Sequence, residues 1–147
     1  MIVSCLSPRQ PGWLALRGQM FPHHAASELL AEMATFCADR ARFGQFLWQP
    51  TGGDALGFAE VSLRSDYVVG TRTSPVAFLE AIYVTPSSRH QGIARKLVAA
   101  AEDWARERGC PEFASDALID NDASHAMHRA LGFEETKRVV YFRKLVG

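Results

Sequence analysis

The feature that most constrains the fold is an apolar strand that runs through a glycine loop into an amphipathic helix. Residues 76–84 (VAFLEAIYV) are apolar on both alternating faces apart from Glu80, as in a central strand that is covered on both sides. A loop ending in Gly92 leads into residues 93–105, where apolar side chains recur at three- and four-residue steps. A strand of this kind needs helices on the faces of its sheet, so the chain is predicted to fold as an α/β or α+β protein.

Strand and helix patterns with turn signals between them account for the rest of the chain. The segment 50–54 (PTGGD) is a strong hairpin signal, and Ser27 is the expected N-cap of a helix that Gly44 ends. The predicted order is β-α-α-β-β-β-α-β-α-β. Its strands cover residues 1–6, 46–49, 55–63, 76–84, 112–118 and 136–146, and its helices cover 12–20, 27–44, 93–109 and 122–131.

Composition and charge exclude several classes of protein. A length of 147 residues with 48% hydrophobic residues suits a single domain over residues 1–147 with one core. Because 16 Lys and Arg balance 16 Asp and Glu, a general nucleic-acid binder is not expected. No apolar run approaches the ~20 residues that span a bilayer, and residues 1–10 lack the features of a signal peptide. Three scattered cysteines predict reduced thiols, so we expect a soluble, cytoplasmic protein without a membrane partner.

The start of the helix after Gly92 is a candidate anion site. The first N–H groups of a helix have no internal acceptor, and together with the helix dipole they suit a diphosphate. No acidic residue lies between Glu80 and Glu102, whereas three cations do: Arg89, Arg95 and Lys96. Cations at this end oppose the dipole, and a bound anion would neutralise both. A solvated helix start, with Gly92 serving only a turn, explains the pattern equally well.

The same segment resembles a known signature. Residues 89–94 (RHQGIA) are similar to the Gln/Arg-x-x-Gly-x-Gly/Ala motif of the GNAT superfamily of N-acetyltransferases, and residues 121–133 match a later segment of that family. The resemblance covers essentially the whole chain. It implies a mixed, mostly antiparallel sheet flanked by helices, with a V-shaped opening between strands 76–84 and 112–118, and acetyl-CoA as cosubstrate.

The resemblance also implies roles for particular residues. Backbone N–H groups of residues 91–95 would hold the coenzyme A pyrophosphate, and the edge of strand 76–84 would pair with the pantetheine arm. His128 falls where many members have the tyrosine proposed as general acid, and a histidine packed beside the cofactor is the alternative. The implied cofactor-binding residues are Ile82, Tyr83, Val84, Arg89, Gln91, Gly92, Ile93, Ala94, Arg95, Lys96, Asn121 and His128.

A closer resemblance extends outside the cofactor motif, to the aminoglycoside 6′-N-acetyltransferases. It rests on residues 13–17, 20–22, 66–68, 74–76, 78–80, 114–116 and 130–135. The resemblance implies acetyl transfer from acetyl-CoA to the 6′-amino group of aminoglycosides, hence antibiotic resistance, by an enzyme that is usually a homodimer. Phe21 and Tyr67 would supply walls for a sugar ring, although each is also a candidate for plain packing.

Two carboxylates are the candidate catalytic groups. Glu80 interrupts an apolar run, where an unpaired carboxylate is costly, and burial would raise its pKa toward that of a general base. A structural salt bridge to Arg64 is the alternative. Asp116 is the only charge in residues 113–119, and beside Glu80 it would attract a polycationic amino sugar and orient it.

Other functions remain open on the sequence alone. The histidine pairs 23/24 and 125/128 lack the Cys or carboxylate partners of a zinc motif, so no metal is expected. The acceptor could instead be another small amine, a polyamine or a protein amine, and a non-catalytic acyl-CoA-binding module is a further alternative. The alternating apolar residues 139–142 would form an exposed strand edge unless they are paired, which agrees with a homodimer.

Overall fold

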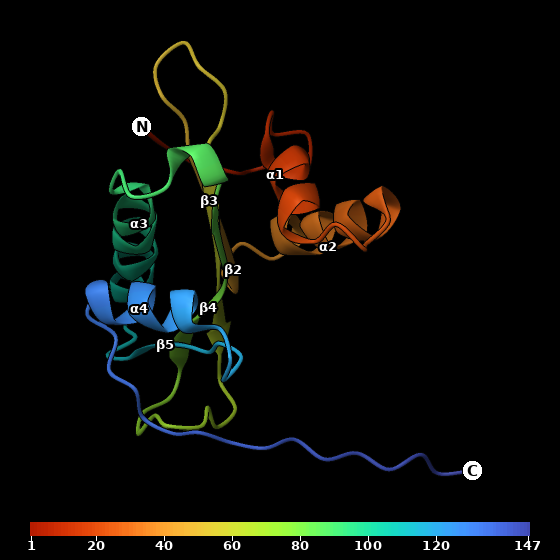
Figure 1. Ribbon diagram of the computed structural model, residues 1–147, viewed down its shortest axis with the longest axis vertical. Helices are drawn as coiled ribbons and strands as arrows, with labels where there is room; N and C mark the ends of the chain where they lie inside the picture. The colour runs from red at the N-terminus through yellow and green to blue at the C-terminus, as the bar shows by residue number, and fades with distance from the viewer. The chain divides into compact units, whose positions relative to one another are not determined.

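A computed structural model describes all 147 residues, which divide into two compact units, residues 1–115 and 116–147. The first unit contains a five-stranded sheet and three α-helices, and the second contains one helix and the C-terminal segment (Figure 1). No helix is long and apolar enough to cross a membrane. The elements are β1 (Ile2–Ser4), α1 (Trp13–Met20), α2 (Ala26–Ala38), β2 (Phe43–Trp48), β3 (Gly57–Arg64), β4 (Val76–Val84), the 3₁₀ turn η1 (Pro86–Ser88), α3 (Ile93–Glu107), β5 (Phe113–Ser115) and α4 (Asp122–Ala130).

The sheet is mixed and mostly antiparallel, which confirms the predicted fold class. Its strands follow the order β1-β2-β3-β4-β5, with antiparallel neighbours from β1 to β4 and a parallel pair between β4 and β5. β5 pairs with β4 only as far as Leu79↔Ser115. Beyond that point, residues 80–84 have β3 on one side and no strand of the sheet on the other. This open edge is the divergence that the resemblance implied.

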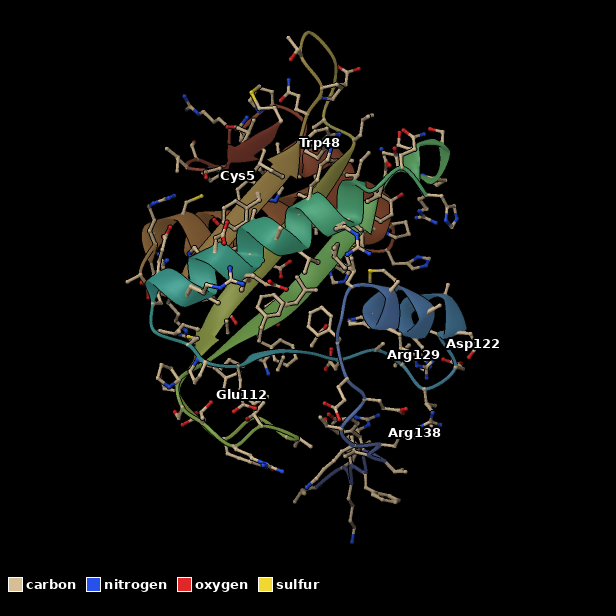
Figure 2. All side chains as sticks on the ribbon, turned by 90° about the vertical axis from the view of Figure 1, so that its left-hand side faces the viewer. Cys5, Trp48, Glu112, Asp122, Arg129 and Arg138 are labelled. Atoms are coloured by element: carbon tan, nitrogen blue, oxygen red, sulfur yellow. The ribbon has the colours of Figure 1, made fainter.

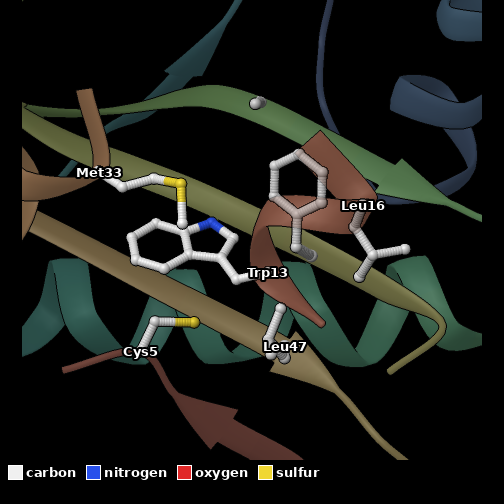
Figure 3. Packing of buried hydrophobic residues seen from close by; sticks show 7 residues of the cluster. Cys5, Trp13, Leu16, Met33 and Leu47 are labelled. Atoms are coloured by element: carbon white, nitrogen blue, oxygen red, sulfur yellow. The ribbon is translucent and has the colours of Figure 1, made fainter. Parts of the chain in front are cut away.

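Helices cover both faces of the sheet in the first unit. In Figure 1, α1 and α2 lie on one face and α3 lies on the opposite face. Burial on both faces explains why β4 matches its predicted bounds. The core on the α1 and α2 side comprises Cys5, Trp13, Leu16, Met33, Leu47, Phe58 and Ala81 (Figure 3). The core on the α3 side comprises Val61, Ala77, Ala101, Trp104, Ala105 and Cys110.

Two predicted helix boundaries are wrong. α2 begins after Ala25, whose carbonyl accepts from Glu28 and Leu29, so Ser27 lies inside the helix and does not cap it. Gly44 does not end that helix, because α2 ends at Ala38 and Gly44 lies within β2. A side chain at Gly44 would come within 2.6 Å of the Trp104 indole, so the glycine allows α3 to pack closely on the sheet.

Two predicted strands also differ from the structure. The strand expected over 112–118 is shortened to β5, residues 113–115. The strand expected over 136–146 is absent, and its apolar side chains are exposed, with Tyr141 at 86% and Phe142 at 92%. Alternating apolar residues predict a face that can be buried, but a strand also needs a neighbour that pairs with its backbone.

Candidate active site

A β-bulge places Glu80 on the surface of an otherwise buried strand. Glu60 of β3 pairs with Ala81 of β4 and Val61 pairs with Leu79, so Glu80 is the extra residue between them. A bulge redirects the side chain that it carries. The Glu80 side chain is 34% exposed, whereas Leu79 is only 3% exposed. The prediction of a buried carboxylate is therefore wrong, and the bulge is the physical reason.

Glu80 is held by two neighbours from β3. Its Oε1 accepts from Arg64 Nε at 3.0 Å, Arg64 Nη2 at 2.8 Å and Ser62 Oγ at 2.6 Å. Its Oε2 accepts only from Arg64 Nη2, at 2.9 Å. The Arg64 guanidinium also lies 3.6 Å from the centre of the Phe78 ring. The salt bridge that the sequence offered as an alternative is thus present, and Oε2 retains the greater capacity to accept from an incoming ammonium group.

The N-terminus of α3 has the backbone of an anion site. Gly92 has φ +80° and caps the helix without a side-chain hydrogen bond, and His90 has φ +64°. The first turn of α3 contains no acidic residue, and a side chain at Gly92 would meet open space. Left-handed residues beside a helix start group backbone N–H donors together, and the first donors of the helix have no internal acceptor. The local structure therefore fits a bound diphosphate.

The cationic side chains of Arg89 and Lys96, near this site, contact neighbouring parts of the protein. Arg89 Nε donates to the Val84 carbonyl at 2.8 Å, and the guanidinium lies 5.4 Å from the Tyr83 ring centre. Lys96 Nζ lies 4.2 Å from the ring centre of Trp48, which Figure 2 labels. Arg89 thus ties the loop before α3 to the end of β4, and Lys96 is held over β2 from the first turn of the helix.

The two candidate acceptor walls have different surroundings. Phe21 follows α1 and packs partly buried against the core, with its ring edge-on to His24 at 5.7 Å. The packing role considered for Phe21 is therefore present. Tyr67 lies in the loop between β3 and β4 and is 71% exposed, whereas its neighbour Val68 is 7% exposed. Tyr67 is therefore available to a ligand.

The second unit contains Asp116, Asn121 and His128. Asp116 is exposed, and Asn121 Oδ1 accepts from Ser124 N at 3.1 Å as the N-cap of α4. His128 Nδ1 lies 2.7 Å from the Ser124 carbonyl. A carbonyl only accepts, so Nδ1 carries the proton, and Nε2 can act as an acid only when the ring is an imidazolium.

The structure also contains a buried polar cluster that the sequence analysis missed. Glu60 Oε2 accepts from Arg17 Nε at 2.8 Å and from Trp13 Nε1 at 2.9 Å. All three residues are less than 5% exposed. Burial raises the pKa of Glu60, while the hydrogen bond and charge of Arg17 oppose that rise. Two signals were available in the sequence: Trp13 and Arg17 are four residues apart on one helix face, and Glu60 interrupts an apolar strand.

No group of three or more His, Cys, Asp or Glu side chains is arranged to hold a metal ion. The donors that the site does present are backbone N–H groups at a helix start and the unpaired edge of a strand. Beside that edge lies a carboxylate held by an arginine. This is the arrangement of an acyl-transfer site that uses a nucleotide-bearing cosubstrate.

Comparison with known proteins identifies the family. The profile of the acetyltransferase (GNAT) family matches residues 12–133, so the chain belongs to the GNAT acetyltransferases. An aminoglycoside N(6′)-acetyltransferase type 1 from Acinetobacter baumannii is 50% identical over 135 residues, which cover 92% of this chain and 91% of that enzyme. The corresponding enzyme from Serratia marcescens is 44% identical over 147 residues, the full length of both chains. The structure of AAC(6′)-Iy in complex with the bisubstrate analog CoA-S-monomethyl-acetylneamine superposes with a TM-score of 0.90 at 39% identity, covering 99% of this chain and 98% of that one.

Proposed function

We propose that this protein transfers the acetyl group of acetyl-CoA to the 6′-amino group of aminoglycosides, and so confers resistance to these antibiotics. The observation that carries the proposal is the end-to-end similarity to an enzyme of this activity, at 44% identity without a missing segment. The bulge at Glu80 adds a physical argument, because it exposes a carboxylate at the open edge of β4, where a cationic acceptor can reach it.

The residues of the first unit fit coenzyme A as cosubstrate. Backbone N–H groups of residues 91–95 would bind the pyrophosphate, and Gly92 leaves room for it because it has no side chain. The unpaired edge of β4 at Ile82, Tyr83 and Val84 would bond the amides of the pantetheine arm. When bound, acetyl-CoA supplies the thioester that the amine attacks. In the second unit, Asn121 and His128 complete the proposed set.

The proposed chemistry is direct transfer between the two substrates. Glu80 takes a proton from the 6′-ammonium group, directly or through a water, because only the free amine has a lone pair. The amine nitrogen bonds to the thioester carbonyl carbon, and a backbone N–H of residues 82–84 stabilises the developing oxyanion. The carbon–sulfur bond then breaks, and the nitrogen, which became cationic on bonding to carbon, releases its second proton to solvent to give the neutral amide. The thiolate leaves and takes a proton from the His128 imidazolium or from solvent.

Acceptor recognition is proposed to rest on a pair of carboxylates and two rings. Asp116 follows directly after Ser115, which pairs with Leu79, the residue before Glu80. Two carboxylates favour a polycationic amino sugar although the net charge of the chain is zero. Exposed Tyr67 and partly buried Phe21 complete the proposed acceptor site.

We also propose that the protein acts as a homodimer in the cytoplasm. The C-terminal segment is rich in apolar side chains that have no partner strand within the chain. A second copy is the partner that would bury them. Free thiols at Cys5, Cys37 and Cys110 fit a reducing compartment.

The test is thiol release from acetyl-CoA with kanamycin or tobramycin as acceptor. The control acceptor is an aminoglycoside that carries a hydroxyl at the 6′ position. Release with the 6′-amine and none with the 6′-hydroxyl is expected. Glu80→Gln and Asp116→Asn should each lower kcat/KM by about 100-fold or more, as removal of a positioned acid or base does. Glu102→Gln, which removes a carboxylate from an exposed ion pair on α3, is the matched control and should retain activity. Release with polyamines and with no aminoglycoside would overturn the proposal.

A further inference from the structure

The loop that presents Tyr67 is tied down at three places, although it contains no helix or strand. Residues 65–75 connect β3 to β4. Ser74 Oγ donates to the Ser65 carbonyl at 2.7 Å and closes the base of the loop. The Val68 side chain is buried against Val76 and Phe78. Within the loop, the backbone N–H and Oγ1 of Thr71 both donate to the Val68 carbonyl, at 3.1 and 2.7 Å, so residues 68–71 form a turn.

Glu112 supplies the third attachment, from a residue 39 positions away in the sequence. Its Oε1 accepts from the backbone N–H of Arg72 at 2.8 Å, the backbone N–H of Thr73 at 2.7 Å and Thr73 Oγ1 at 2.5 Å. Figure 2 shows Glu112 at the foot of the sheet, directly above this loop. One carboxylate oxygen thus accepts from the N–H groups of two successive peptide units, and it fixes the backbone on both sides of Arg72.

Glu112 is itself fixed to the sheet. Its carbonyl accepts from the Ala77 N–H at 3.2 Å, and the next residue, Phe113, pairs with Ala77 in the register of β5 and β4. The hydrogen bonds from Thr73 and Arg72 lower the pKa of Glu112, so the group is a carboxylate at neutral pH. The loop is therefore joined to β4 through a charged acceptor whose backbone belongs to the sheet.

We propose that Glu112 is a positioning residue for the acceptor, which holds the 65–75 loop in the conformation that presents Tyr67 to the aminoglycoside. The inference rests on the proposed function and deepens it, because it assigns acceptor affinity to a residue outside the candidate site. Tyr67 touches the sugar and Glu112 acts through Tyr67. The Glu112 carboxylate binds the loop, which places three hydrogen-bond donors on its Oε1, and it does not bind the substrate.

The test compares Glu112→Ala with Glu112→Gln, in which the amide oxygen still accepts from the loop while the charge is gone. Glu112→Ala should raise the KM for a 6′-amino aminoglycoside about tenfold, with kcat and the KM for acetyl-CoA within twofold of wild type. Glu112→Gln should recover most of the loss. Thr73→Val, which removes one donor of three, should give a smaller rise. An effect of Glu112→Gln equal to that of Glu112→Ala would overturn the proposal in favour of simple charge attraction.

A double-mutant cycle with Tyr67 separates positioning from an independent effect. If Glu112 acts through Tyr67, Tyr67→Ala and Glu112→Ala/Tyr67→Ala should have the same KM for the acceptor. Additive effects would overturn the proposal. Hydrogen exchange of residues 66–73 gives a readout that needs no substrate: protection should fall in Glu112→Ala and return in Glu112→Gln. Unchanged exchange would refute the loop attachment itself, whereas a wild-type enzyme that is inactive with every aminoglycoside would refute the proposed function.

Discussion

At the scale of single residues, the core of the first unit contains a buried pair of opposite charges, Arg17 and Glu60. The Arg17 guanidinium is 2% exposed, and it bonds both oxygens of Glu60 and the carbonyl of Leu29. It also lies 5.5 Å from the ring centres of Phe21 and Phe36. A buried pair of this kind adds little stability of its own, but removing one partner leaves a charge without compensation. The pair therefore links α1 to β3, and the bond from Arg17 to the Leu29 carbonyl links both to α2.

Arg17→Met should destabilise the protein by about 3–5 kcal/mol at pH 8, measured by urea unfolding. The pH dependence has a definite sign. The pKa of Glu60 is higher in the folded protein than the unfolded value of 4.5, so protonation of Glu60 favours the folded state. This stabilisation is fully present below pH 4.5 and is lost as the pH rises through the folded pKa. Without Arg17 the folded pKa rises further, so the deficit relative to wild type should shrink between pH 8 and pH 5. Arg17→Met/Glu60→Gln should unfold less readily than Arg17→Met, and a deficit independent of pH would contradict this account.

The two carboxylates of β3 and β4 show what sequence could and could not predict at a residue. Glu60 and Glu80 each interrupt an apolar strand, and on sequence they are equivalent. The structure buries one against α1 and exposes the other through a bulge. Alternation assigns a side chain to a face only while the register is regular, and a one-residue bulge reverses it. Glu80 therefore remains a candidate catalytic group, and the structure gives it exposed surroundings in place of the buried ones expected from the sequence.

At the scale of elements, the start of α3 is the part of the site that the sequence predicted best. The helix begins at Ile93, directly after the glycine that the pattern marked, and β4 has its predicted bounds. The start of α3 and the bounds of β4 depend on local conformation and on burial within one chain. Hydrophobic periodicity in the sequence indicates both of these properties. Their short connection keeps the open edge of β4 and the N–H groups of α3 close in sequence. The residues proposed to bind the cofactor therefore come mainly from one short stretch of the chain, the end of β4 and the start of α3.

Gly92→Ala tests this element. The residue has φ +80° with open space around it, so an added methyl group costs about 1 kcal/mol of backbone strain and meets no atom. Because the strain acts on the turn that aims the N–H groups, the KM for acetyl-CoA should rise about tenfold or more. Gly109→Ala is the matched control, since it lies at the other end of α3 with φ +72° and equally open surroundings. Both variants should lose similar stability, and equal KM values for acetyl-CoA would show that the glycine serves only the turn.

At the scale of the whole molecule, two properties leave copies of the chain free to associate. The net charge is zero, so electrostatic repulsion between copies is weak. The C-terminal segment exposes large apolar side chains, including Val140 at 77%, Phe142 at 92% and Val146 at 96%. The strand predicted there is absent because no other segment of the chain pairs with its backbone, and periodicity alone does not show whether a neighbour exists. An exposed segment of this kind is an interaction site or a liability.

Substitutions in the C-terminal segment test whether it is an interaction site between two copies of the chain. Val140 and Phe142 are two residues apart, so they share one face of a strand, and Val140→Asp/Phe142→Asp would place two carboxylates in any interface that they form. By light scattering after gel filtration, wild type should have twice the chain mass of 16.2 kDa and the double variant should have a single chain mass. Lys144→Asp changes charge in the same segment without removing an apolar residue, and it should remain a dimer. Since dimerisation stabilises by mass action, the Tm of wild type should rise with protein concentration and that of the double variant should not. A wild-type mass of one chain at all concentrations would leave the segment without a partner copy.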